Sequence, residues 1–345
     1  YYNDYIAYER IPILYYYTHA TVNPEIRPLL DQIKAAPAAE EVEPYNYAYY
    51  NMDKFVHKRD DYTFMLSLSS ERIDKYEAIN NEGYTDWYIA DGMTYLLMDS
   101  EQYIIDWWES VDRYAIPGTT VDSSERNPYG SSYATIRPNN AWAGGASDGT
   151  IAVAAMQLPS VAAGKTSYVD GTKSYFMLDD KIVCMGTGIS GGQGEVYTTV
   201  ENYESRDAAP AGTEAVREDG YTPVTVDGQE VPYVFDSKLS YQNPQYISLN
   251  NDRGWVFFGD NDVTVERVVQ NKRYAGLNKT PTESAYDVPF VTVKIEHGES
   301  PQNETYGYVI MPNKTEAELA EYAGNPDFEV LEQTDARHVI QLYDG

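Results

Sequence analysis

The sequence predicts a mainly β protein whose strands are antiparallel. Ten segments read as extended strands, Gly-rich or Asn/Asp-rich turns separate them, and few segments have the apolar spacing of a helix. The pattern is clearest between residues 62 and 68, where Phe64, Leu66 and Leu68 occupy alternate positions. Such a period of two indicates a strand with one face more buried than the other. No internal repeat is visible, so the strands are expected to pack as large sheets.

The predicted strands run through the chain in order. They occupy residues 62–68, 151–157, 174–177, 181–185, 196–200, 233–235, 255–258, 263–269, 290–295 and 306–311. The sixth is short and follows Pro232, which has no N–H to donate to a ladder.

Helix signals gather near the two ends of the chain. Residues 28–34 have the apolar spacing of a short helix, which Pro37 ends, and residues 38–44 resemble an acidic linker. Near the other end, residues 315–321 begin with Thr315 as N-cap and Glu318 three positions later, a capping box. We therefore expect a short helical segment at 1–45 and a β domain at 46–345.

Charge and composition limit the function classes. The formal net charge of −29 over 345 residues repels nucleic acid and anionic lipid, whose binding needs clustered Lys and Arg. No run approaches about 18 consecutive apolar residues, so no membrane span is predicted. The chain starts without Met or a signal pattern, and we expect a processed chain or a part of a longer one.

Two residue types are used unusually. Cys184 is the single cysteine and lies in an apolar strand, which favours a buried, inert thiol. The 34 tyrosines against 8 phenylalanines suit exposed strand faces and interfaces, so self-association is one expectation.

Several short motifs between residues 51 and 202 recur in one known family. They are Met52-Asp53-Lys54 with His57, Tyr76-Glu77 with Asn80, Trp87-Tyr88 with Asp91-Gly92-Met93, Pro117-Gly118-Thr119-Thr120, and the segments 173–183 and 198–202. In this order they resemble the central β domain of polysaccharide lyase family eight, the hyaluronate, chondroitin AC and xanthan lyases. The resemblance covers most of the chain from residue 50. It implies a super-sandwich of the galactose-mutarotase-like type, and makes residues 1–45 a connector or the end of an α/α toroid.

The resemblance also implies catalytic roles for Glu77 and Asn80. In the family such a Glu helps to hold the arginine and tyrosine of the toroid, and such an Asn binds sugar or supports the pocket. The implied reaction is β-elimination at a uronate of an acidic polysaccharide. The family's Asn, His, Tyr and Arg belong to the toroid and have no match here, so the chain is not expected to be active alone. The alternative is a polar turn with an Asn cap.

Four further residues are candidates for substrate binding. Lys54 and His57 belong to a basic cluster that could attract an acidic glycan, although a solvated strand entry is an alternative. Trp87 and Tyr88, like Trp107-Trp108, could stack on sugar rings, although core packing is the default for such aromatics.

No cofactor is expected. The segment 164–166 resembles the end of a phosphate-binding loop, but Pro159 stands where that motif needs its first glycine. The segment 259–262 offers oxygen atoms to calcium, but it lacks the spread of a calcium loop, and an exposed turn is the alternative.

Two interpretations of function stay open. The first is the β domain of a lyase acting on a uronate-containing polysaccharide. The second is a non-catalytic extracellular module that binds carbohydrate or assembles with itself. Both place the protein outside a bacterial cell or in the periplasm.

Overall fold

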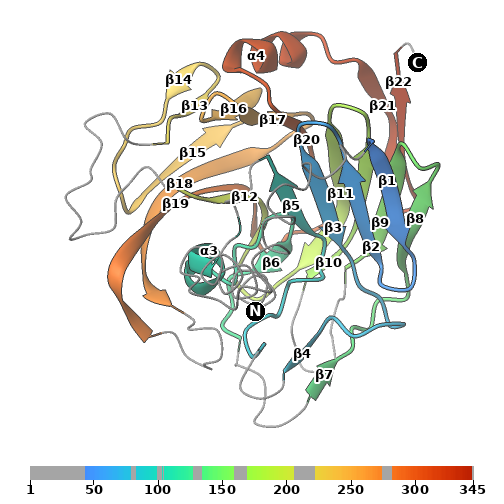
Figure 1. Cartoon of the computed structure of the whole chain (residues 1–345), viewed down its shortest axis with the longest axis horizontal. Coiled ribbons are helices and arrows are strands. Elements are labelled where there is room, and N and C mark those ends of the chain that lie inside the picture. The colour runs from blue at the N-terminus through green and yellow to red at the C-terminus, as the bar shows by residue number, and fades with distance from the viewer. Residues whose placement is uncertain are drawn as a thin grey trace, which may run out of the picture.

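The computed structural model describes residues 43–78, 83–98, 103, 105–126, 134–158, 169–205, 222–273 and 282–343. The helical segment expected at 1–45 lies outside these ranges except for its last three residues. The described chain is built mainly of strands, and every strand pair recorded within it is antiparallel (Figure 1). The predicted fold class is therefore confirmed.

A nine-stranded sheet forms the body of the molecule. From one edge to the other its strands are β14 (Gln229–Glu230), β13 (Val224–Val226), β16 (Tyr246–Leu249), β17 (Arg253–Phe257), β20 (Glu304–Pro312), β11 (Ile182–Gly191), β10 (Val169–Met177), β9 (Ala152–Gln157) and β8 (Ala143–Ser147).

Two smaller sheets pack against one face of this sheet. One contains β1 (Tyr45–Tyr49), β2 (Lys54–Lys58), β3 (Thr63–Ser67) and β5 (Met93–Leu97); the other contains β15 (Ser237–Gln242), β18 (Asp262–Arg273), β19 (Thr282–Glu299), β12 (Glu195–Glu204) and β6 (Thr120–Asp122). The main core joins all three, because Phe64 of β3, Cys184 of β11 and Val293 of β19 are fully buried in one cluster. Alternate residues of each strand therefore meet across the layers.

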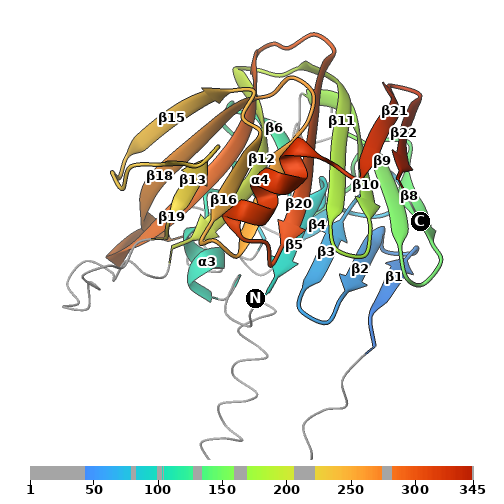
Figure 2. The same cartoon turned by 90° about the horizontal axis from the view of Figure 1, so that it is seen from above.

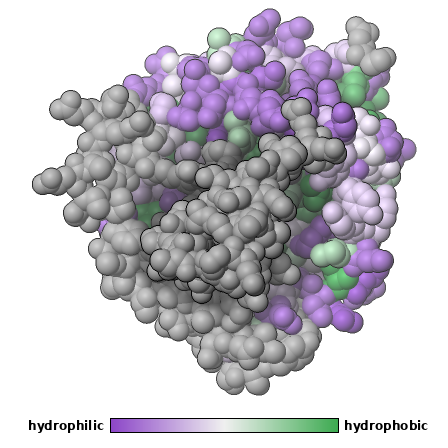
Figure 3. Space-filling model, in the orientation of Figure 1, coloured by the Kyte–Doolittle hydropathy of each residue, from purple (hydrophilic) through white to green (hydrophobic). Residues whose placement is uncertain are grey.

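The opposite face of the nine-stranded sheet is covered only in part. Helix α4 (Glu316–Gly324) lies across β16 and β17, and the hairpin of β21 (Phe328–Thr334) and β22 (Arg337–Leu342) lies beside β11 (Figure 2). Val183, Met185 and Leu319 pack together beneath these elements. Figure 3 shows hydrophilic residues gathered over α4, in keeping with the acidic composition.

Two short elements complete the described fold. Helix α3 (Ile105–Ser110) buries Trp107 in a small core with Phe290 of β19. Strands β4 (Tyr76–Ala78) and β7 (Ala134–Ile136) pair with each other outside the three sheets, at the lower edge in Figure 1.

Nine of the ten predicted strands coincide with strands of the structure, and the helix predicted at 315–321 is α4. The prediction at 233–235 is wrong, because this segment after Pro232 enters a turn and the strand begins at Ser237. The buried thiol predicted at Cys184 is confirmed, and burial raises its pKa to about 12.

Candidate active-site rim

Glu77 lies in the middle of β4 and points to solvent. Strand β4 pairs with β7, with Glu77 opposite Thr135. Tyr76 and Ala78 on either side are 7% and 0% exposed, so the alternation of the strand leaves Glu77 on the outer face. The alternative of a polar turn does not hold for residues 76–78, which form a strand whose Tyr76 and Ala78 are buried on the inner face. Asn80 lies outside the described residues.

A buried ion pair anchors the start of this strand. Lys75 directly precedes β4, and its ammonium group pairs with the Asp91 carboxylate; both side chains are almost fully buried. Burial lowers the pKa of Lys75, and the negative charge of Asp91 acts in the opposite direction. Breaking such a pair leaves one charge buried without its partner, so the pair fixes the position of β4.

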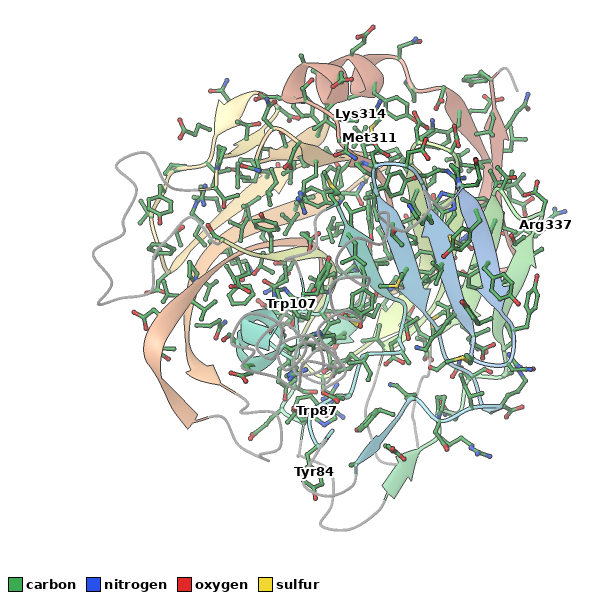
Figure 4. All side chains as sticks on the ribbon, viewed as in Figure 1. Tyr84, Trp87, Trp107, Met311, Lys314 and Arg337 are labelled. Carbon is green, nitrogen blue, oxygen red and sulfur yellow. The ribbon has the colours of Figure 1, made fainter. Side chains whose placement is uncertain are left out.

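An aromatic cluster lies under the strand. It contains Tyr76, Trp87, Tyr88 and Tyr197, and Tyr114 packs on Trp87 with their ring centroids 5.3 Å apart. Trp87 and Tyr88 are only 3% and 1% exposed, as core packing predicts, and substrate binding by them stays a prediction. Figure 4 shows Trp87 and Tyr84 in the lower part of the molecule, on the side of β4. These aromatics pack together beneath the rim and support it.

The motifs around Gly92 and Gly118 form two turns that touch. Both glycines have positive φ, 86° and 81°, and a Cβ on Gly118 would lie 2.4 Å from the carbonyl oxygen of Gly92. A Cβ on Gly92 would meet the Tyr175 hydroxyl at 2.2 Å, and Tyr175 also donates to the Gly92 carbonyl at 3.2 Å. Only glycine fits this crossing, which holds Asp91 in reach of Lys75.

Arg126 is a buried cation near this rim that sequence analysis missed. Its guanidinium pairs with Asp122 at 2.5 Å, and its backbone N–H donates to the Tyr114 hydroxyl at 2.6 Å. Asp122 also accepts from the backbone N–H of Gln193 at 2.9 Å. An arginine four residues after an aspartate gave no distinct signal, because such pairs are common on protein surfaces.

Lys54 and His57 belong to β2 and not to the rim. The His57 side chain is fully buried; Asn46 donates to its Nδ1 at 3.0 Å, and its Nε2–H donates to the Leu178 carbonyl at 2.6 Å. Burial lowers the pKa of His57 to about 4, so the ring is neutral near pH 7. The Lys54 ammonium donates to the Ser67 hydroxyl at 2.5 Å, and burial lowers its pKa as well. His57 therefore brings no charge to the surface, and attraction of an acidic glycan by this cluster stays a prediction.

The remaining candidates have structural roles in the described residues. Trp107 is fully buried and donates its indole N–H to the Asn202 carbonyl at 2.9 Å. In the 259–262 turn Asn261 donates its amide to the Phe258 carbonyl at 2.9 Å; calcium binding there stays a prediction. Within the part of the chain that the structure describes, no three His, Cys, Asp or Glu side chains gather to hold a metal ion. Nor is any helix of that part long and apolar enough to cross a membrane.

The comparison with known families agrees with the fold and with the order of the motifs. The sequence profile of the polysaccharide lyase family 8 super-sandwich domain matches residues 44–323. This chain belongs to polysaccharide lyase family 8. The motifs of Glu77, Trp87-Tyr88 and Gly92 fall on the rim and its supports, whereas Lys54 and His57 lie on β2 and the β21–β22 hairpin follows the matched region.

Curated relatives in the family are much longer than this chain. A hyaluronate lyase of Enterococcus faecalis is 30% identical over 306 residues, which are 85% of this chain and 29% of that protein. A xanthan lyase of a Bacillus species is 33% identical over 317 residues, which are 89% of this chain and 32% of that protein. The chain thus spans about a third of the length of these family members.

Solved structures show the same architecture. A Paenibacillus xanthan lyase matches with a TM-score of 0.77 at 30% identity, over 92% of this chain and 30% of that one. A chondroitin AC lyase of Streptomyces coelicolor A3 matches with a TM-score of 0.71 at 27% identity, over 92% of this chain and 39% of that one. The super-sandwich inferred from sequence is therefore confirmed.

Proposed function

We propose that this chain forms the β-domain wall of a polysaccharide lyase active site that cleaves a uronate-containing acidic polysaccharide by β-elimination. The observation that carries the proposal is Glu77, a solvent-facing carboxylate on a strand whose neighbours are buried and fixed, in a family 8 super-sandwich. The curated relatives named above are lyases of hyaluronan and xanthan by their names.

Glu77 would act on groups that this chain does not supply. In β-elimination a base removes the proton beside the uronate carboxylate, and the 4-oxygen leaves with a returned proton. A carboxylate at the rim can orient a tyrosine base and an arginine of a facing helical domain by accepting hydrogen bonds from them. Asn80 would bind sugar or support the same pocket.

The buried pair of Lys75 and Asp91 holds the strand that carries Glu77 in a fixed position. A positioning carboxylate is useful only if its strand is held within about 0.5 Å of the productive geometry. The ion pair and the aromatic cluster of Tyr76, Trp87 and Tyr197 hold β4 from below. The absence of a helical partner from the described residues is the reason that we expect no turnover by the chain alone.

The test compares this chain alone with the same chain joined to the α/α toroid of a family relative. Each is incubated with hyaluronan, chondroitin and xanthan, and ultraviolet absorbance follows the unsaturated uronate that β-elimination forms. We expect absorbance to rise only with the joined protein. No rise with any uronate polymer, from a joined protein that is folded, would reject the proposal.

A further inference from the structure

A cavity of about 510 Å³ opens on the face of the nine-stranded sheet that α4 leaves uncovered. Its floor is formed by β8, β9 and β10, and one wall is the turn of the β21–β22 hairpin. Figure 4 shows Arg337 of this hairpin at the outer edge of the molecule, well away from Trp87 and the β4 rim. The cavity has the size of a small-ligand site and no role in the proposed reaction.

Trp142, which directly precedes β8, also lines the cavity. Its side chain is 44% exposed, whereas Trp87, Trp107 and Trp255 are at most 3% exposed. The floor beside it is low and apolar, with Gly145, Ala155 and the half-exposed Val153. An exposed indole beside small residues leaves room for a ring to lie against the indole face.

The hairpin wall is fixed to the sheet beneath it. His338 is hydrogen-bonded through Nδ1 to the Ser174 hydroxyl at 2.7 Å and through Nε2 to the Thr187 hydroxyl at 2.8 Å. Gln333 donates its amide to the carbonyls of Gly186 and Tyr306 at 3.1 and 2.9 Å. The cavity is therefore preformed, and a ligand would not have to order its wall.

The charges at this wall favour a neutral ligand. The Arg337 guanidinium pairs with Glu332 at 2.8 Å, and Asp335 adds a carboxylate to the lining. The wall thus carries no excess positive charge for a uronate carboxylate. The Asp335 carboxylate, the Arg337 guanidinium and the Thr334 hydroxyl can instead form hydrogen bonds with sugar hydroxyls.

We propose that this cavity binds a neutral pyranose ring of a glycan chain, stacked on Trp142 and hydrogen-bonded by the side chains of Asp335 and Arg337. An apolar indole and a polar turn that line the same cavity match a sugar, which has C–H faces and a hydroxyl rim. The site goes beyond the proposed elimination and does not depend on it, because binding requires no turnover.

The experiment measures binding of three oligosaccharides to this chain by calorimetry and by tryptophan fluorescence. The probes are cellohexaose, which is neutral, a hyaluronan octasaccharide, which alternates neutral and charged rings, and an oligogalacturonate, in which every ring is charged. We expect saturable binding of the first two and none of the third. The exposed indole of Trp142 should report the binding as a change in fluorescence.

Two variants and a control complete the test. Trp142→Ala and Val153→Glu should each weaken binding about tenfold or more, because one removes the stacking face and the other fills the floor. Tyr50→Ala, which truncates an aromatic that is 54% exposed outside the cavity, should bind as the original chain does. All three change exposed side chains, so their thermal unfolding should be close to that of the original chain.

Absence of binding to all three probes would overturn the proposal, as would binding of the oligogalacturonate alone. Unchanged affinity of a folded Trp142→Ala variant would also overturn it. A lyase that is active without this binding would leave the proposed function intact, so the two failures are distinguishable.

Discussion

At the scale of single residues, buried ionisable groups decide how this domain responds to its surroundings. His57 is neutral and fully buried, and its two ring nitrogens are hydrogen-bonded to the Asn46 side chain and the Leu178 carbonyl. Lys75 is equally buried, and its ammonium group pairs with the Asp91 carboxylate. His57 should make the stability of the domain depend on pH. The Lys75–Asp91 pair should make it sensitive to the loss of either partner.

Stability should fall in acid through His57. Its folded pKa of about 4 lies below the ordinary value of 6.5, so the unfolded chain takes up the proton first. Neutral, buried His57 therefore contributes about 3 kcal/mol to the free energy of unfolding above about pH 6.5. This contribution is lost as the pH falls towards 4. A His57→Gln variant can keep one donor and one acceptor without titrating. Urea unfolding between pH 7.5 and 4.5 should show a smaller loss for this variant, and equal pH profiles would contradict the assignment.

Removing one partner of the Lys75–Asp91 pair should be costly. Lys75→Met leaves the Asp91 carboxylate buried without its cation, which should lower the free energy of unfolding by about 3–5 kcal/mol. The double variant Lys75→Met with Asp91→Leu removes both charges and should recover much of that loss. Urea unfolding of the single and double variants measures the coupling; additive losses would show that the two groups do not depend on each other.

At the scale of elements, α4 is the most clearly specified part of the chain. Thr315 accepts from the backbone N–H of Glu318 at 3.4 Å, and Glu318 accepts from the backbone N–H of Thr315 at 2.8 Å. Leu319 is the buried residue of the helix, and it packs so closely on β17 that a Cβ on Gly254 would lie 2.2 Å from it. Local capping and one packed side chain thus fix the helix against the sheet.

Thr315→Ala should lower the free energy of unfolding by about 0.5–2 kcal/mol, because the backbone N–H of Glu318 loses its side-chain acceptor and the Glu318 carboxylate loses the Thr315 hydroxyl. Glu321→Ala is the matched control: it truncates an exposed residue of the same helix away from the cap. Thermal unfolding compares the two. A loss of stability in the control as large as in the cap variant would argue against the capping explanation.

At the scale of the whole molecule, the alternation of apolar residues predicted most long strands, and the family motifs predicted how the sheets are arranged. Most strands that were not predicted, such as β4, β7 and β8, have five residues or fewer, which carry too little periodicity, and Gly144-Gly145 read as a turn; the longer β15, β21 and β22 were missed as well. The strand prediction at 233–235 was wrong for a related reason. Three apolar residues resemble a strand, but Pro232 and the following turn determine the conformation of this segment.

The candidate site could be predicted only in part. The family motif pointed to Glu77, and strand alternation between two buried neighbours leaves its side chain exposed. It also suggested Trp87, Tyr88 and His57 as ligand contacts, and these lie buried because their aromatic bodies fill the layer beneath the rim or between sheets. Trp142 gave no signal, since the cavity beside it is made by a hairpin nearly 200 positions later in the chain. Contacts between distant segments are not visible in local patterns.

The most direct test of the central claim is the turnover of a Glu77→Gln variant in the active, toroid-joined protein. We predict that kcat on the cleaved uronate polymer falls at least about tenfold. An amide accepts weaker hydrogen bonds from an arginine and a tyrosine than a carboxylate does. The melting temperature should stay unchanged, because Glu77 is exposed. Glu304→Gln, which changes an exposed glutamate on β20, should keep full activity. Full turnover by the folded Glu77→Gln variant would contradict the account.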